Sequence, residues 1–281
     1  MQWAFKLGLK LLFSRLPIPY SVWKSLGAFR HGKMDSADYA LKIFLLHTQR
    51  AFPAGIPDDL VFLELGPGDS AASALIAFAY RAKQTILVDV GDFVSRDSRF
   101  YIQLAEKLSA QNLRVPQLKS VHTFDEVLAI SRASYLTQGL ESLHSIPTAS
   151  VDFIWSHSVL EHVRKADFQA VLLELKRILR PGGFASHNID FQDHLVGSLN
   201  NLRFSEPVWE SEFFVRSGFY TNRIPAIRMH ALFAQAGFKV CKEGFGRWGN
   251  LPVPRKSLHA DFQQFSDAEL INRTSHVLLS A

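Results

Sequence analysis

The chain has 281 residues, of which 47% are hydrophobic and 20% are charged, a composition that suits one large α/β domain with an appendage. Its single cysteine, Cys241, excludes an internal disulfide and a zinc site built from cysteines, and fits a reducing, cytoplasmic compartment. The basic excess is confined to residues 1–50, which carry a net charge of +6 against −1 for the remainder. We therefore expect no nucleic-acid-binding face on the main domain.

The N-terminal segment mixes apolar and basic residues. Lys6, Lys10 and Arg15 interrupt an otherwise apolar stretch, which argues against a signal peptide, and no apolar run reaches the roughly 18 residues of a transmembrane helix. We expect helices over 1–14, 20–29 and 36–50, forming an N-terminal extension or lid over residues 1–55. The first helix either contacts an anionic membrane surface peripherally, at the inner face, or packs on the main domain, and packing is favoured.

A glycine turn follows the first predicted strand. Val61 to Leu65 is an apolar run typical of a buried parallel strand, and Gly66 and Gly68 around Pro67 permit a tight turn that a ligand can approach closely. The alanine-rich helix that follows is expected to begin with Ser70 as its cap. This strand, turn and helix predict a nucleotide-binding α/β fold and also fit a dinucleotide fingerprint. A turn without a ligand is the alternative.

The remaining predicted elements alternate. Strands are expected over 85–89, 134–137, 151–155, 184–189, 238–242 and 276–280, and helices over 97–110, 126–131, 166–179 and 225–236. Arg180-Pro-Gly-Gly183 is read as a helix terminator. Alternation predicts a mostly parallel sheet with right-handed crossovers, in which ligands bind beyond the carboxyl ends of the strands. Glu64, Asp89, Ser156 and His187 fall at or near those ends.

Asp89 is the predicted ribose ligand. It ends the second strand, where a carboxylate can accept hydrogen bonds from both hydroxyls of a ribose. The alternative role is to cap a helix near Gly91.

Together these motifs resemble the class I S-adenosylmethionine-dependent methyltransferases, of the type 11 or type 23-like domain. The resemblance covers residues 58–190 well and 225–281 loosely. It rests on Glu64-Leu-Gly66-Pro-Gly68, Leu87-Val-Asp89, Ser156-His-Ser-Val-Leu-Glu161-His162-Val, Leu173-Glu-Leu-Lys-Arg-Ile-Leu-Arg-Pro-Gly-Gly183 and His230-Ala-Leu-Phe-Ala-Gln-Ala-Gly-Phe238.

The resemblance implies a Rossmann-like, doubly wound α/β sheet of seven strands with helices on both faces. The last strand would be antiparallel and inserted beside the fifth. The methyltransferase domain would span residues 56–281, with an acceptor-binding insertion over 191–225. S-adenosyl-L-methionine is the implied cofactor.

The implied cofactor contacts follow the motifs residue by residue. The methionine portion would be held by Glu64, Gly66, Pro67 and Gly68, the ribose by Asp89, the sulfonium side by Ser156 and His157, and the adenine near Gly139, Glu141 and Ser142. Two positions depart from the family pattern. Ser70 stands where a third glycine is usual, and Leu140 stands where an aspartate often contacts the adenine.

Methyl transfer to oxygen or nitrogen benefits from a nearby base. The candidates are His157, His187, Asp190, Asp193 and His194, four of which lie within the eight residues 187–194. That segment is alternatively a solvated loop or a metal site. Glu161-His162 resembles part of a metal-binding pattern in quinone-biosynthesis O-methyltransferases, but Ser158 stands where those have a further glutamate. We expect no metal, and a structural hydrogen bond for His162.

The irregular stretch 191–225 is expected to bind the acceptor, because long irregular segments in compact domains tend to be functional. Its candidate contacts are Arg203, Trp209, Tyr220, Asn222 and Arg223, and the alternative is a lid that only packs. We expect methyl transfer to a small-molecule or glycan-like acceptor, at oxygen. The alternatives are an NAD-type oxidoreductase, favoured by the glycine pattern alone, and a catalytically silent cofactor-binding or scaffold protein at a membrane surface. The sequence does not predict an oligomeric state.

Overall fold

A computed structural model of the chain describes residues 2–13, 15, 33–116 and 123–281. The helix expected over 20–29 lies outside these residues. The chain forms two compact units. The glycine-turn unit contains residues 30–157, 173–187 and 278–281, and the insertion unit contains 1–29, 158–172 and 188–277. This division runs through the predicted N-terminal extension, because its first helix belongs to the insertion unit and its last helix to the glycine-turn unit.

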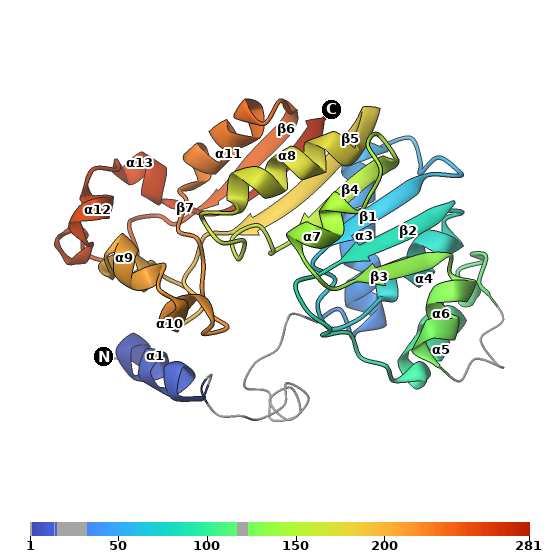
Figure 1. The fold of residues 1–281 in the computed structure, drawn as a ribbon, viewed down its shortest axis with the longest axis horizontal. Coiled ribbons are helices and arrows are strands. Elements are labelled where there is room, and N and C mark those ends of the chain that lie inside the picture. Colours follow the sequence, from blue (N-terminus) through green and yellow to red (C-terminus); the bar gives the residue numbers. More distant parts are fainter. Residues whose placement is uncertain (1, 14, 16–32, 117–122) are drawn as a thin grey trace. The chain divides into compact units, whose positions relative to one another are not determined.

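The strands form one seven-stranded sheet in the order β3-β2-β1-β4-β5-β7-β6. Their bounds are β1 Val61–Leu65, β2 Gln84–Val88, β3 Ala133–Leu136, β4 Val151–His157, β5 Leu179–Asp190, β6 Lys239–Arg247 and β7 Asn272–Ser280. β1 pairs in parallel with β2 and β4, and β2 pairs in parallel with β3, which brings the carboxyl ends of these strands to one edge (Figure 1). The sheet is mostly parallel with an antiparallel last strand inserted beside the fifth, as the resemblance implied.

The core of the glycine-turn unit is built from aromatic and small side chains. Its helices are α3 Ala37–Ala51, α4 Ala72–Ala79, α5 Ser98–Ala110, α6 Phe124–Ile130 and α7 Leu140–His144. All eight residues of α4 are buried, because their side chains are mostly alanines and aliphatics that pack closely. Phe44 of α3 packs on Phe62 of β1, with ring centroids 5.7 Å apart, and on Trp155 of β4 at 6.5 Å. Helix α3 is therefore part of this core.

Two local predictions were wrong in detail. Ser70 is not the N-cap residue of α4, which is Ala71, although the Ser70 hydroxyl accepts from the Ala72 amide at 3.3 Å and donates to the carbonyl of Met34. The Arg180-Pro-Gly-Gly183 segment belongs to β5, which begins directly after helix α8 (Phe168–Ile178). A Cβ at Gly183 would lie 2.8 Å from the Asp152 carbonyl oxygen. This glycine therefore allows the strand to approach β4 closely.

The insertion unit contains several short helices, three of them within the stretch 191–225 that we predicted to be irregular. They are η1 Asn200–Arg203, α9 Glu206–Trp209, α10 Glu212–Val215, η2 Arg255–Ser257, α12 Ala260–Gln263 and α13 Asp267–Leu270, joined by α1 Gln2–Phe13 and α11 Ala226–Gln235. Leu7 of α1 is buried in a cluster with Leu195, Trp209, Phe214, Phe219 and Tyr220. Thus α1 packs within this unit, as favoured from the sequence. None of the helices in the described part of the chain is long and apolar enough to cross a membrane.

Candidate active site

The glycine turn and Asp89 meet at the carboxyl end of β1 and β2. Gly66 and Gly68 have φ values of 72° and 63°, in the left-handed region that glycine adopts readily. The Gly68 amide donates to Asp89 Oδ2 at 3.1 Å, and the Val90 amide donates to Oδ1 at 2.7 Å. Burial raises the pKa of Asp89 to about 6, although these two amides lower it. The carboxylate is therefore largely ionised at pH 7 and retains lone pairs for a ribose diol.

Glu64 lies in the middle of the sheet beneath this turn. Its side chain is 2% exposed and accepts a hydrogen bond from the Ser73 hydroxyl at the start of α4. Burial raises the pKa of Glu64 to about 8, the Ser73 hydrogen bond lowers it, and the nearby Asp89 charge raises it further. Glu64 is thus mainly protonated at pH 7, and a cation such as an ammonium group would stabilise its ionised form.

Sequence reasoning missed Val90, the residue directly after Asp89. Its side chain is 79% exposed, although the residues before it are buried. A Cβ at Gly139 would lie 3.1 Å from Val90 Cγ1, and the Gly139 amide donates to the Asp89 carbonyl at 2.8 Å. An exposed apolar side chain beside the ribose candidate suits the flat face of a base. Glu141 is exposed as well, and one of its carboxylate oxygens lies 3.6 Å from His144 Nδ1.

Three histidines and two serines form polar contacts at the ends of β4 and β5. Ser156 Oγ lies 2.8 Å from His187 Nδ1, and both residues are fully buried. His47 of α3 lies with Nδ1 2.8 Å from Ser186 Oγ and with Nε2 3.2 Å from His157 Nδ1. Sequence reasoning missed His47, because the residues that it contacts lie far away along the chain.

Burial keeps these histidines neutral. Burial and the Arg50 charge lower the pKa of His157 to about 4, and burial lowers the pKa of His187 to about 3. Burial also places the pKa of His47 well below its ordinary value, although a backbone hydrogen bond to Ser186 raises it. With its proton on Nδ1, donated to Ser186 Oγ, neutral His47 would accept from His157 Nδ1 through Nε2, and His157 would keep a lone pair on its own Nε2.

The other predicted catalytic residues belong to the insertion unit. Asp193 is buried and accepts hydrogen bonds from the amides of Leu195, Val196 and Asn200. Burial raises its pKa, but hydrogen bonds from Val196, Asn200 and Ser198 together lower it. Asp190 Oδ1 accepts from the amide and the side chain of Gln192. These contacts shape the turn after β5. His194 extends from this turn and stacks on His162, with ring centroids 4.7 Å apart.

Most predicted acceptor contacts are buried and bonded to protein. Trp209 Nε1 donates to the Thr221 carbonyl at 2.8 Å, and the Tyr220 hydroxyl donates to Glu210. The Asn222 side chain donates to two backbone carbonyls of the segment after β4. The Arg223 guanidinium donates to backbone carbonyls and pairs with Glu206 at 3.2 Å.

Arg203 differs from these four residues in being only half-buried. Its guanidinium lies over the ring of Trp3, 5.2 Å from the centroid.

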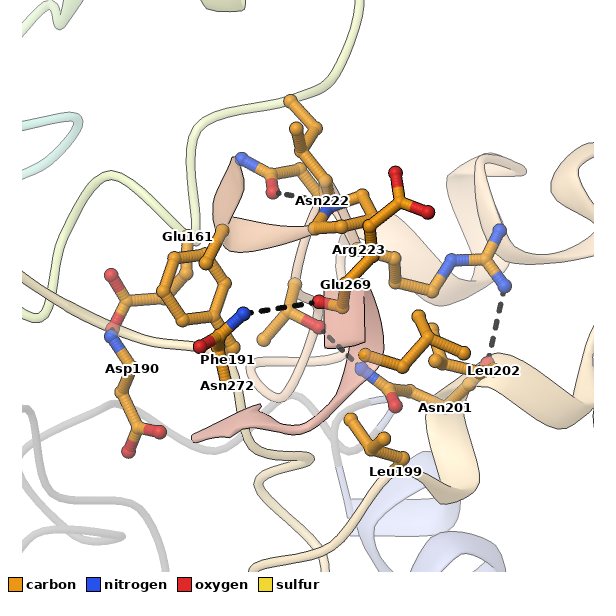
Figure 2. Close-up of a pocket in the computed structure, with 15 residues that line it drawn as sticks. Glu161, Asp190, Phe191, Leu199, Asn201, Leu202, Asn222, Arg223, Glu269 and Asn272 are labelled. Atoms are coloured by element: carbon orange, nitrogen blue, oxygen red, sulfur yellow. Dashed lines mark hydrogen bonds between the residues drawn. The ribbon is translucent and has the colours of Figure 1, made fainter. Parts of the chain in front are cut away.

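A small cavity lies within the insertion unit, and Asn222 and Arg223 are among the residues that line it (Figure 2). It has a volume of about 30 Å³, enough for one or two water molecules and far too small for a metabolite. Glu161, Asn201 and Arg223 line it, and each has a buried polar atom without a hydrogen-bond partner among the described residues: Oε2, Oδ1 and Nε, respectively. Burial keeps the pKa of Glu161 well above its ordinary value.

Among the comparisons with known proteins, a family model matches part of this chain. Residues 63–186 match the family model of a methyltransferase domain. No curated protein matches the chain. The matched range contains the glycine turn, Asp89 and the end of β4, and it stops within β5, one residue before His187.

Three solved structures are among those that match this chain. A Mesorhizobium loti S-adenosylmethionine-dependent methyltransferase is 12% identical, with coverage of 89% of this chain and 100% of that one and a TM-score of 0.47. A Haloferax volcanii methyltransferase, in complex with the Trm112 activator, is 17% identical, with 89% and 94% covered and a TM-score of 0.45. The Haemonchus contortus phosphoethanolamine N-methyltransferase 2, with phosphomonomethylethanolamine and S-adenosylhomocysteine, is 14% identical, with 85% and 52% covered and a TM-score of 0.46.

The ligands and the activator protein named above were found with those proteins. In this chain, the matched residues contain the glycine turn and Asp89, and the sheet has seven strands, as the resemblance implied. Residues 63–186 therefore form a methyltransferase domain, with S-adenosyl-L-methionine as its cofactor.

Proposed function

We propose that the protein transfers the methyl group of S-adenosyl-L-methionine to a hydroxyl of a small-molecule or glycan-like acceptor. The observation that carries the proposal is the Gly68–Asp89 hydrogen bond inside the matched methyltransferase domain. The cofactor supplies a methyl group already activated by a sulfonium. The residues of the chain have to bind and align the two reactants and exclude water.

The cofactor roles follow from the chemistry of the side chains. Asp89 would accept hydrogen bonds from the ribose hydroxyls, and the glycine turn would allow the main chain to approach the methionine portion. Glu64 would support its ammonium group, which favours ionisation of this buried acid. Val90 and Gly139 would contact the adenine. Val90 replaces Glu141 as our preferred candidate because its side chain is apolar and directly follows Asp89, whereas Glu141 is charged and lies 3.6 Å from His144 Nδ1.

His157 is the proposed base. Its ring is neutral at pH 7, and the contact with His47 leaves Nε2 able to accept a proton from an acceptor hydroxyl. His47 acts as a positioning residue, since it touches His157 through one nitrogen and β5 through the other. Fully buried His187 would instead fix Ser156 at the end of β4.

Isothermal titration with S-adenosylmethionine, S-adenosylhomocysteine and NAD tests the cofactor assignment. We expect binding of the first two compounds and none of NAD. Binding of NAD alone would overturn the assignment. Release of S-adenosylhomocysteine with a panel of alcohols, phenols and amines then tests the acceptor class. Turnover only with amines would contradict the proposed oxygen acceptor.

The role of His47 is tested by His47→Asn and His157→Asn with any acceptor found. Both changes should lower kcat with little effect on cofactor affinity, and His47→Asn should also shift the pH dependence of kcat. Cofactor affinity serves as the control that the site remains folded. A purely structural His47 would lower stability but leave the pH profile of kcat unchanged.

A further inference from the structure

Three side chains with metal-ligating atoms meet in the insertion unit, outside the residues proposed to bind the cofactor. Glu161 and His162 follow β4, and His194 follows β5. One ligand atom of each lies within 4.8 Å of the corresponding atoms of the other two. We propose that Glu161, His162 and His194 form a binding site for a divalent transition-metal ion of the Zn²⁺ type.

Burial of unpartnered polar atoms supports a ligand at this place. Glu161 is 1% exposed, and its Oε2 has no hydrogen-bond partner among the described residues. Within the same part of the structure, the buried His194 Nε2 also lacks a partner. Buried acceptors of this kind are rare because each loses its hydration without replacement. A cation bound between them would satisfy both.

The protein already orients the proposed ligands. The Tyr220 carbonyl lies 2.7 Å from His162 Nδ1, so this nitrogen carries the hydrogen and Nε2 carries the lone pair. Glu161 Oε1 accepts from the Asp190 amide at 3.2 Å, which turns the other oxygen away from that bond. Such outer hydrogen bonds are typical of metal sites, where they fix tautomers and side-chain directions.

The backbone carrying the first two ligands is fixed as well. The Asn222 side chain donates to the carbonyls of Leu160 and Val163, on either side of Glu161 and His162, at 2.8 and 3.0 Å. The Asn222 amide donates to the Glu161 carbonyl at 2.7 Å. His194 lies in the turn that the Asp193 carboxylate holds. Little backbone rearrangement is therefore required for binding.

The geometry requires a modest closure of side chains. Zinc lies about 2.0–2.2 Å from nitrogen and oxygen ligands, so tetrahedral ligand atoms are about 3.4 Å apart. The rings of His162 and His194 stack at an interplanar angle of 24°, and both must tilt to direct their lone pairs at one ion. Burial, the largest effect, and the Lys10 ammonium lower the pKa of His194, whereas the nearby Asp190 and Asp193 carboxylates raise it.

The donor set selects the class of metal. Two imidazoles and one carboxylate suit Zn²⁺, Fe²⁺, Co²⁺ or Ni²⁺, whereas Mg²⁺ and Ca²⁺ prefer oxygen ligands. Three protein ligands leave a coordination position open. Of the three proposed ligands, Glu161 also lines the cavity in Figure 2, which is large enough for a water molecule. From the sequence alone we expected no metal ion, because Ser158 stands where the quinone-biosynthesis O-methyltransferases have a further glutamate.

The test uses the full chain carrying Cys241→Ser, since the exposed thiol would otherwise bind zinc by itself. After treatment with a chelator, titration with Zn²⁺ against a chromogenic chelator should give one tight site. Glu161→Gln, His162→Gln and His194→Gln should each weaken this site by about 100-fold or more. The matched control is His144→Gln, which alters an exposed Glu–His pair and should leave zinc affinity unchanged. Mg²⁺ should not compete.

Two further measurements keep the outcome independent of folding and of catalysis. Long-range nitrogen NMR of the histidine rings should show zinc-dependent shifts for His162 and His194 and none for His144. Cofactor titration of each variant separates metal binding from the proposed function, because Glu161→Gln should retain S-adenosylmethionine affinity. The proposal is overturned if zinc binds only weakly or non-stoichiometrically, or if the three variants keep the affinity of the parent.

Discussion

The Gly68 amide donates a hydrogen bond to Asp89 Oδ2 at 3.1 Å, which joins the glycine turn after β1 to the end of β2. Asp89 therefore both supports the turn and presents a carboxylate next to it. A ligand that bridges the two elements would interact with groups that are already in place, so little ordering is needed on binding.

Replacement of Asp89 by Asn should weaken S-adenosylmethionine binding by about 1–3 kcal/mol, since it removes charge-assisted hydrogen bonds to the ribose. Isothermal titration measures the change. Asp92→Asn is the matched control, because Asp92 lies in an exposed ion pair with Arg96. Equal affinities for Asp89→Asn and the parent would show that the ribose is held elsewhere.

Cofactor affinity should depend on pH through Asp89. Because burial raises the pKa of Asp89 to about 6, the carboxyl takes up a proton as the pH falls from 7 to 5 and no longer accepts from both hydroxyls. Affinity should therefore decrease below about pH 6, approaching tenfold per pH unit. The Asp89→Asn variant should lack this decrease. A parent protein with constant affinity between pH 5 and 7 would contradict the ribose role.

Glu64 should make the unliganded protein less stable as the pH rises. Its pKa of about 8 lies above that of the unfolded chain, so its favourable contribution is present at low pH and is lost between about pH 4.5 and 8. Relative to the parent, Glu64→Gln should gain up to about 1.4 kcal/mol of unfolding free energy per pH unit in this window. Urea unfolding at pH 5.5 and 7.5 measures the gain. An identical difference at both values would refute the raised pKa.

Gly139→Ala should destabilise the fold by about 1–2 kcal/mol. Gly139 has a φ of 54°, where a side chain is strained, and the new Cβ would lie 3.1 Å from Val90 Cγ1. Gly249→Ala is the control, because a Cβ there has no atom within 4 Å and the backbone is not left-handed. Denaturant titration compares the two variants. Similar stabilities would mean that the turn at Gly139 adapts freely.

Asn222→Ala should destabilise the insertion unit by about 2–3 kcal/mol, since it leaves the carbonyls of Leu160 and Val163 without their donor. Exposed Asn250→Ala should change stability by less than about 0.5 kcal/mol. Asn222→Ala should also weaken zinc binding at the proposed metal site, because it releases the segment that carries Glu161 and His162. If Asn222→Ala were as stable as the parent protein, Asn222 would again be a candidate for acceptor binding.

The sequence alone predicted the mostly parallel sheet, and it supplied the residues that we propose to bind the cofactor. Apolar runs alternating with helical periodicity, a glycine turn after the first run and an acid after the second are local patterns. Because parallel strands place their carboxyl ends at one edge, these patterns also predicted that Glu64, Asp89 and Ser156 lie at the same edge. The seven-stranded arrangement was implied by the resemblance of these motifs to a known methyltransferase family.

Only the tertiary structure decided which polar side chains are available for chemistry. The sequence could not reveal that Asn222 and Arg223 bind backbone carbonyls, because such partners leave no signal in residue type. It likewise could not place His47 against His157, or His194 beside Glu161. These contacts join residues far apart in the chain, and they depend on packing, which decides where polar groups are buried and paired.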